Sequence, residues 1–447
     1  MKIENDKFYK RLFGLAFPIA IQSLMLALVA AGDALMLGRV GQDEMTSVSL
    51  ATQIQFVQNM VIYSVTGAGA ILGAQYFGKG DKRTLENLFH IMLRLCIGVS
   101  ILFFIGCEFF PQYLMAIFTG SDKLNALGCS YLRIAGYSYL LTGISQCYLT
   151  IMKVSDHVPV SAFISSGAVV INIVLNAVFI FGLLFCPAMG VKGAALATTL
   201  ARIIELALCI SFSYRKDYIR PELKTFFDKK PGLIQDFFKQ CIPLLGGSML
   251  WGVGFTSYTA IIGHMGENAA AANSIASVVR DLICCVCNGI GSAAGIMVGY
   301  EFGAGNLEKG KAYGIKLVKI SYVIGFVSTG FVLLITPLVV RMVILTDEAR
   351  YYLVGMMIIM AVYMIGRCVN TVAINGVLDG GGDTVFDMYS LAVCMWVIAI
   401  PLALLGAFVF HWHVFAVYAC TCLDEVGKIP WVMVRLKKYK WVQDLTK

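Results

Sequence analysis

Charged residues are scarce in this chain, and long polar stretches are scarcer still. Aspartate, glutamate, lysine and arginine make up 14% of its 447 residues, whereas 58% of the residues are hydrophobic. A soluble domain typically carries about 25% charged residues. The chain therefore has too little polar surface for a soluble globular protein, and a membrane protein is the class that its composition favours.

Enzyme signatures are missing as well. The sequence contains neither HExxH nor GxSxG. Its segment GAQYFGKG at 73–80 resembles a phosphate-binding loop, but no Ser or Thr follows the Lys and an apolar helix precedes it. The fourteen cysteines lie mostly inside apolar blocks and show no metal-site spacing with histidine, so we expect small buried residues. These absences argue against hydrolysis and ATP-driven transport, and we predict no enzyme and no cofactor.

The apolar residues form long blocks, and this is the strongest signal for the fold. A helix needs roughly 20 residues to cross a bilayer, and the blocks do not alternate polar with apolar residues as barrel strands do. The sequence therefore predicts an all-α integral membrane protein with twelve transmembrane helices. The twelve predicted spans cover 11–37, 46–77, 86–118, 128–153, 158–184, 190–214, 236–264, 269–302, 312–345, 349–378, 384–409 and 412–434.

The two halves of the chain repeat one pattern at an offset of 225 residues. The matched pairs are Pro18 and Pro243, Gly38 and Gly263, Gly41 and Gly266, Ser49 and Ser274, Ala51 and Ala276, Phe77 and Phe302, Gly78 and Gly303, and Gly80 and Gly305. Six helices in each half give a parallel repeat, which is typical of transporters whose substrate site lies between the halves. We predict a lobe at 1–213, a linker at 214–235, a second lobe at 236–434 and a basic tail at 435–447.

The basic residues predict the orientation of the spans. Lysine and arginine concentrate in alternate connections, in the linker at 214–235 and in the tail at 435–447, which places both termini in the cytoplasm. This pattern accounts for the net charge of +8 without nucleic-acid binding. The first apolar block is too long for a cleaved signal peptide. We expect the linker to rest on anionic lipid headgroups and Trp441 to anchor the tail.

One acid lies inside the first predicted span. Asp33 follows an uncharged stretch on a helix that also contains Pro18, which removes a backbone hydrogen bond and favours a kink. A carboxylate that faces the interior of a helix bundle loses hydration, and it could then exchange a proton or ligate sodium. The alternative is a solvated, passive Asp33 at the external end of the helix.

Other polar residues within the spans are candidates for a site. Asn172 and Asn176 lie four residues apart, hence on one helix face, where they could bind a cation or join two helices. Arg202 and Glu205 lie three apart and can pair, which we interpret as structural.

The second half has its own candidates. Arg280, Asp281 and Arg367 lie within predicted spans, and they could line a cavity together with Trp251 and Tyr258. Tyr258 is the repeat mate of Asp33, so the second half has no acid at that position.

The chain resembles the MATE (multidrug and toxic compound extrusion) transporters over essentially its full length. The matching segments are Pro18 with Asp33 and LGRVG, then GAQYFGKGD, NIVLNAVFIFG, GVKGAALAT, IP with LWGVG, VGYEFGAGN, VLDGGGDT and KKYKWVQDLT. The resemblance implies twelve helices in two lobes around a cavity that opens alternately to each side. It also implies export of cationic or amphipathic compounds in exchange for protons or sodium.

The resemblance assigns roles residue by residue. Asp33 matches the family's ion-coupling acid, Asn172 matches an asparagine of the same pocket, and Thr198 matches a pocket hydroxyl. Asn176 stands where studied members often have Asp, and Ser248 where many relatives carry Glu. Both departures remove a carboxylate, which puts a two-acid mechanism in doubt and leaves the second half without the family's acid.

We therefore expect a monomeric secondary antiporter in the plasma membrane, surrounded by lipid. Two alternatives remain: a lipid-linked oligosaccharide flippase of the same superfamily, and a non-transporting membrane sensor or scaffold. Twelve spans and Asp33 favour the antiporter over the flippase, and the absence of a predicted docking domain argues against the scaffold.

Overall fold

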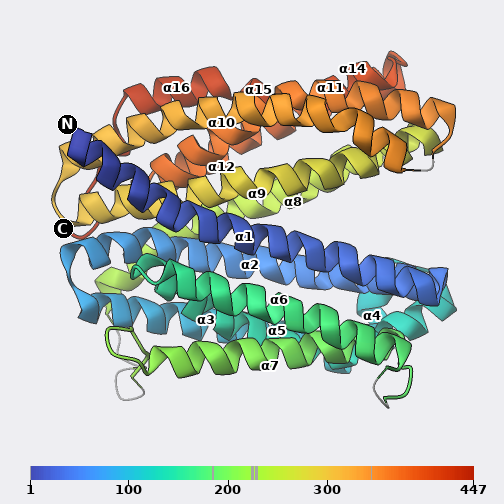
Figure 1. The fold of residues 1–447 in the computed structure, drawn as a ribbon, viewed down its shortest axis with the longest axis horizontal. Helices are drawn as coiled ribbons and strands as arrows, with labels where there is room; N and C mark the ends of the chain where they lie inside the picture. Colours follow the sequence, from blue (N-terminus) through green and yellow to red (C-terminus); the bar gives the residue numbers. More distant parts are fainter. Residues whose placement is uncertain (1, 184–185, 223–225, 227–229, 344) are drawn as a thin grey trace. The chain divides into compact units, whose positions relative to one another are not determined.

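The computed structural model describes residues 2–183, 186–222, 226, 230–343 and 345–447. The helices of the first half are α1 (Lys2–Val40), α2 (Gln42–Lys79), α3 (Lys82–Phe109), α4 (Pro111–Ala116), α5 (Asp122–Val154), α6 (Val158–Phe181) and α7 (Val191–Ser213). The long helices of the second half are α8 (Pro231–His264), α9 (Glu267–Gly303), α10 (Leu307–Met342) and α11 (Asp347–Asn370). Each predicted block up to residue 345 therefore coincides with one long helix, except the third block at 86–118, which is divided between α3 and the short α4 (Figure 1).

The last two predicted spans are broken into shorter pieces. The π-helical turn η1 (Thr371–Leu378) continues α11, and 384–409 forms α12 (Thr384–Leu391), η2 (Ala392–Ala399), α13 (Ile400–Leu404) and η3 (Leu405–Val409). The block at 412–434 was expected as one helix, but it forms α14 (Val414–Thr421), α15 (Leu423–Val426) and α16 (Ile429–Lys437). Pro430 at the start of α16 has no N–H for an intrahelical bond, which favours a new helix start there.

Nine helical segments within the described ranges are long and apolar enough to cross a membrane. The predicted spans outside this set are those of α5 and α8, which are rich in glycine and hydroxyl side chains, and the broken block at 412–434.

The chain forms two compact units. The first unit is Ile21–Cys241, and the second combines Met1–Ala20 with Ile242–Lys447. The chain passes between the units inside α1 and α8, next to Pro18 and Pro243, and both helices continue through these prolines. The lobes predicted from the sequence repeat, with boundaries at 213 and 236, follow the order of helices along the chain and stay a prediction.

Each unit has its own apolar core. In the first unit, α5 packs against α2, α3 and α7, and α6 packs against α7. In the second unit, α9 packs against α10, α11 and η1. Four methionines of α11 are completely buried in the core of the second unit, which is the ordinary packing role of this flexible side chain: Met356, Met357, Met360 and Met364. All fourteen cysteines are free thiols, and most are buried.

The two termini of the chain lie at one end of the second unit (Figure 1). The ring of Phe8 near the start of α1 contacts Tyr313 of α10. Trp441 of the tail, expected as a surface anchor, is completely buried: its ring packs against Phe302, and its Nε1 donates to the Leu436 carbonyl at 3.1 Å. The tail is therefore an integral part of the second unit, because burying an indole removes a large apolar area from solvent.

The glycine segments near residues 80 and 305 are structural turns. Gly80 ends α2 with φ of 79°, and its repeat mate Gly305 has φ of 80° after α9. A residue with a side chain rarely adopts this left-handed conformation, so glycine is needed in both halves. The following residue, Asp81, caps α3 by accepting a hydrogen bond from the backbone N–H of Thr84 at 3.0 Å. Partial burial raises the pKa of Asp81, but the hydrogen bonds from Thr84 and the charges of Lys79 and Lys230 together lower it, and the pKa lies below its usual value.

Gly80→Ala and Gly305→Ala should each destabilise the protein by about 1 kcal/mol, because a methyl group strains a positive φ. No atom lies within 4 Å of the added carbon at either site, so the conformation alone is tested. Gly98→Ala in α3 is the matched control: the space around it is also open, and its backbone is helical. Thermal unfolding in detergent measures the effect, and equal melting temperatures for all three variants would contradict the prediction.

Candidate functional site

A cavity of about 510 Å³ lies within the first unit. Its wall includes Asp33 from α1, Asn172 from α6, and Thr198 with Arg202 from α7. Tyr131 of α5 and polar side chains of α2 complete the polar part of the wall. The cavity thus contains one acidic residue, Asp33, one basic residue, Arg202, and several neutral hydrogen-bonding groups on helices that are otherwise apolar.

Four of the predicted site residues form one chain of hydrogen bonds at this cavity. The Asn176 side-chain amide donates to Asp33 Oδ1 at 2.5 Å and to Asn172 Oδ1 at 3.2 Å. Asn172 Nδ2 in turn donates to Thr198 Oγ1 at 3.3 Å. The hydroxyl of Thr198 donates to the Ala194 carbonyl at 3.0 Å. Helix geometry had placed Asn172 and Asn176 on one face, but only the packing of α1, α6 and α7 brings Asp33 and Thr198 to them.

Asn176 is the centre of this chain. Its side chain is completely buried, and its oxygen has no hydrogen-bond partner among the described residues. Its amide hydrogens are directed at two oxygen acceptors, and one of these is the carboxylate of Asp33. An amide that bridges two oxygens holds the carboxylate in a set position and leaves the other carboxylate oxygen available to a ligand.

Arg202 and Glu205 form the ion pair that their spacing predicted. Arg202 Nη1 donates to Glu205 Oε2 at 2.6 Å. The hydroxyl of Ser145 donates to the same oxygen at 3.3 Å. Glu205 is completely buried, whereas Arg202 lines the cavity that contains Asp33. The pair therefore connects the cavity with the interior of the unit, which the sequence alone had not indicated.

The second unit contains its own cavity of about 260 Å³. All five residues that we proposed as cavity-lining line it: Trp251, Tyr258, Arg280, Asp281 and Arg367. The rings of Trp251 and Phe255 are stacked with centroids 5.5 Å apart, and the guanidinium of Arg280 lies 4.6 Å from the centre of the Phe255 ring. One wall is thus aromatic and carries a cation on its surface.

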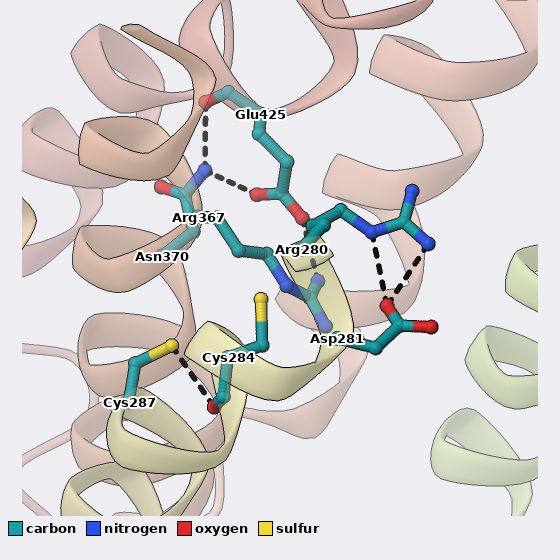
Figure 2. A network of polar contacts seen from close by, with 7 residues as sticks. All are labelled: Arg280, Asp281, Cys284, Cys287, Arg367, Asn370 and Glu425. Atoms are coloured by element: carbon teal, nitrogen blue, oxygen red, sulfur yellow. Dashed lines mark hydrogen bonds and ion pairs between the residues drawn. The ribbon is translucent and has the colours of Figure 1, made fainter. Parts of the chain in front are cut away.

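Three of these lining residues, Arg280, Asp281 and Arg367, belong to a network of ion pairs and hydrogen bonds (Figure 2). Arg367 Nη1 donates to Glu425 Oε1 at 2.7 Å, and Asn370 Nδ2 donates to Glu425 Oε2 and to its carbonyl oxygen, both at 2.7 Å. Arg280 pairs with the adjacent Asp281, its Nη2 lying 2.9 Å from Oδ1. Glu425 is 4% exposed, and its buried carboxylate accepts two of these hydrogen bonds, one from Arg367 and one from Asn370.

The second unit contains acids that the sequence analysis did not propose. Positions 248 and 258 have no acid, as the sequence shows, but α15 adds two carboxylates, Asp424 and Glu425, to the predicted Asp281. Asp424 lines the cavity and is 5% exposed. The signal was present in the segment LDEVGK, whose charges interrupt the apolar block at 412–434, and intramembrane charges mark candidate sites.

Comparison with known proteins identifies the class. The MatE family model matches residues 18–178 and again 243–405. The two matches begin 225 residues apart, at Pro18 and Pro243, so the family pattern confirms the parallel repeat. The chain is a multi-pass membrane transporter, and it belongs to the MatE family.

Two relatives cover nearly the same length. The uncharacterised transporter YisQ of Bacillus subtilis is 23% identical over 99% of this chain and 97% of the relative. A probable multidrug resistance protein NorM of Bradyrhizobium diazoefficiens is 25% identical over 90% of this chain and 87% of that protein.

Solved structures confirm the fold. A variant of the Vibrio cholerae MATE transporter VcmN has a TM-score of 0.90 at 13% identity and covers 98% of both chains. A transporter of the MOP superfamily from Pyrococcus furiosus has a TM-score of 0.86 at 17% identity, covering 98% of this chain and 96% of that one. The predicted class of twelve helices in two six-helix lobes is therefore confirmed.

Arg367→Met should destabilise the protein by about 3–5 kcal/mol, because it removes the cation that is hydrogen-bonded to the buried carboxylate of Glu425. The double variant Arg367→Met/Glu425→Gln should recover much of this loss, since no unpaired charge remains in the pair. Lys239→Met is the control: it breaks an exposed pair with Asp236, which contributes at most about 1 kcal/mol. Melting temperatures in detergent test this, and a double variant no more stable than the single one would refute the pairing argument.

Proposed function

We propose that this transporter is a secondary active antiporter that exports cationic or amphipathic small molecules in exchange for protons or sodium ions. The observation that supports this most directly is the carboxylate of Asp33 in the cavity of the first unit, held by Asn176 at 2.5 Å. An ionisable side chain within a membrane helix is costly and typically serves the transported ion or substrate. The names of the NorM relatives, which designate multidrug resistance proteins, favour small-molecule cargo.

Exchange follows from the presence of one acid in the polar wall of the cavity. Asp33 can be neutralised by a proton, by a sodium ion or by a cationic group of the cargo, and these ligands compete for the same oxygens. A ligand shifts the balance between inward-open and outward-open states only through its different affinity for the two. Neutralisation of Asp33 removes a charge from the interior of the unit, and the packing around Asn176 then depends on which ligand is bound. The ion that moves down its gradient displaces the cargo from Asp33.

The remaining parts of the proposal concern the setting of the protein. We place it as a monomer in the plasma membrane, surrounded by lipid and with both termini in the cytoplasm. Clustering of basic residues in alternate connections supports this orientation. Location of both termini at one end of the second unit is in keeping with it (Figure 1). Protons or sodium are the only co-reactants that the proposal needs.

Asp33→Asn should abolish ion-driven transport, because asparagine can still accept the hydrogen bond from Asn176 but carries no charge. The assay is efflux of a fluorescent cationic dye from proteoliposomes, with a proton gradient or a sodium gradient imposed separately. Asp122→Asn, the same change at an exposed position at the start of α5, serves as control and should transport normally. Undiminished efflux by Asp33→Asn under the driving gradient would overturn the assignment.

The wild-type protein tests the antiport itself. Efflux driven by one of the two gradients identifies the coupling ion. If neither gradient moves the dye, although the protein is folded by its melting curve, the flippase alternative gains and the antiport proposal fails.

A further inference from the structure

The cavity of the first unit contains opposite charges. Asp33 and Arg202 are the charged residues of its described lining, one from α1 and one from α7. The guanidinium of Arg202 interacts electrostatically with Asp33. Because position 176 is an asparagine, no second carboxylate in the hydrogen-bonded chain of Asp33 offsets this positive charge.

Arg202 is held in position by an ion pair with the buried Glu205. Its Nη1 is bonded to Glu205 Oε2 at 2.6 Å, one helical turn further along α7, and Ser145 of α5 donates to the same oxygen. Glu205 is completely buried, whereas the Arg202 side chain is 19% exposed. Lys153 of α5 also acts electrostatically on Glu205. The guanidinium is therefore fixed at the wall of the cavity.

We propose that Arg202 is a fixed positive charge that limits how tightly Asp33 holds a cation, and that Glu205 is the tether that keeps Arg202 from pairing with Asp33. This inference rests on the proposed role of Asp33 in binding the exchanged ion and the cationic cargo. Arg202 is a positioning residue: it opposes any second cation in the cavity by like-charge repulsion, which promotes release. Glu205 holds the charge near Asp33 but prevents the two from forming a closed ion pair.

The same charge sets the class of cargo. A monovalent cation can place its charge at Asp33 and its neutral part along the apolar wall. A dication would bring its second charge into the field of Arg202 within a cavity of about 510 Å³. The cavity therefore favours monocations over dications of similar size, since a like charge costs more in a partly dehydrated site than in water.

The test compares Asp33, Arg202 and Glu205 variants of the full chain, purified in detergent, by equilibrium dialysis at fixed pH without sodium. Arg202→Gln should bind tetraphenylphosphonium, a monocation, about tenfold more tightly, because the opposing charge is gone. The same variant should gain still more affinity for methyl viologen, a dication. Arg202→Lys, which keeps the charge, should stay near wild type. Arg133→Gln, the same charge removal at an exposed position of α5, should change nothing.

The proposed role of Glu205 predicts that its removal lowers the affinity for a cation, whereas removal of Arg202 raises it. In Glu205→Gln the guanidinium is free to turn to Asp33, so tetraphenylphosphonium should bind more weakly than to wild type. The double variant Arg202→Gln/Glu205→Gln leaves neither member of the pair charged, and it should still bind tetraphenylphosphonium more tightly than wild type. If Glu205→Gln does not fold, the double variant and Arg202→Lys still decide the question.

Two failures can be told apart. Normal tetraphenylphosphonium binding by Asp33→Asn would refute the proposed function and with it this inference. Loss of binding in Asp33→Asn together with unchanged or weaker binding in Arg202→Gln would refute the role of Arg202 alone. A merely structural ion pair would make all pair variants weaker, including the double one, whereas the proposal requires shifts of both signs.

Discussion

Polar groups inside the apolar helices of this protein must find their partners within the protein, because the hydrocarbon of a membrane offers none. Asp33 depends on this constraint most clearly, since its carboxylate is positioned by the buried amide of Asn176. The same amide also donates a hydrogen bond to Asn172, and the Asn172 amide donates one to Thr198. A single intramembrane acid thus determines which side chains three different helices must present to one another.

The two units meet this constraint in different ways. The first uses neutral amides and a hydroxyl around its acid, with one ion pair, Arg202 and Glu205, behind the cavity. The second uses formal charges, Arg367 against Glu425 and Arg280 against Asp281, beside an aromatic wall. Neutral partners leave the carboxylate of Asp33 able to accept a ligand. Close ion pairs satisfy their members, so the second unit contains groups that are largely committed to one another.

The repeat preserves the backbone and not the chemistry. Gly80 and Gly305 adopt the same left-handed turn because the path of the chain requires it in both halves. Asp33 and Tyr258 occupy matching positions, yet one is an acid and the other is not. Asp281 of α9 was among the predicted cavity residues, and α15 adds two further carboxylates, Asp424 and Glu425, that were not among the predicted sites.

The sequence by itself determined the class of this protein. Twelve apolar blocks and a constant repeat offset suffice for the fold, because hydrophobicity and chain reversal are local properties that residue order records directly. Helix periodicity also placed Asn172 beside Asn176 and Arg202 beside Glu205. Only the tertiary structure decided that Asp33 joins the two asparagines, that Arg202 shares its cavity, that Asp424 lines the cavity of the second unit and that Trp441 is buried. These contacts join residues far apart in the chain, and they depend on the rotation and packing of whole helices, which no local pattern encodes.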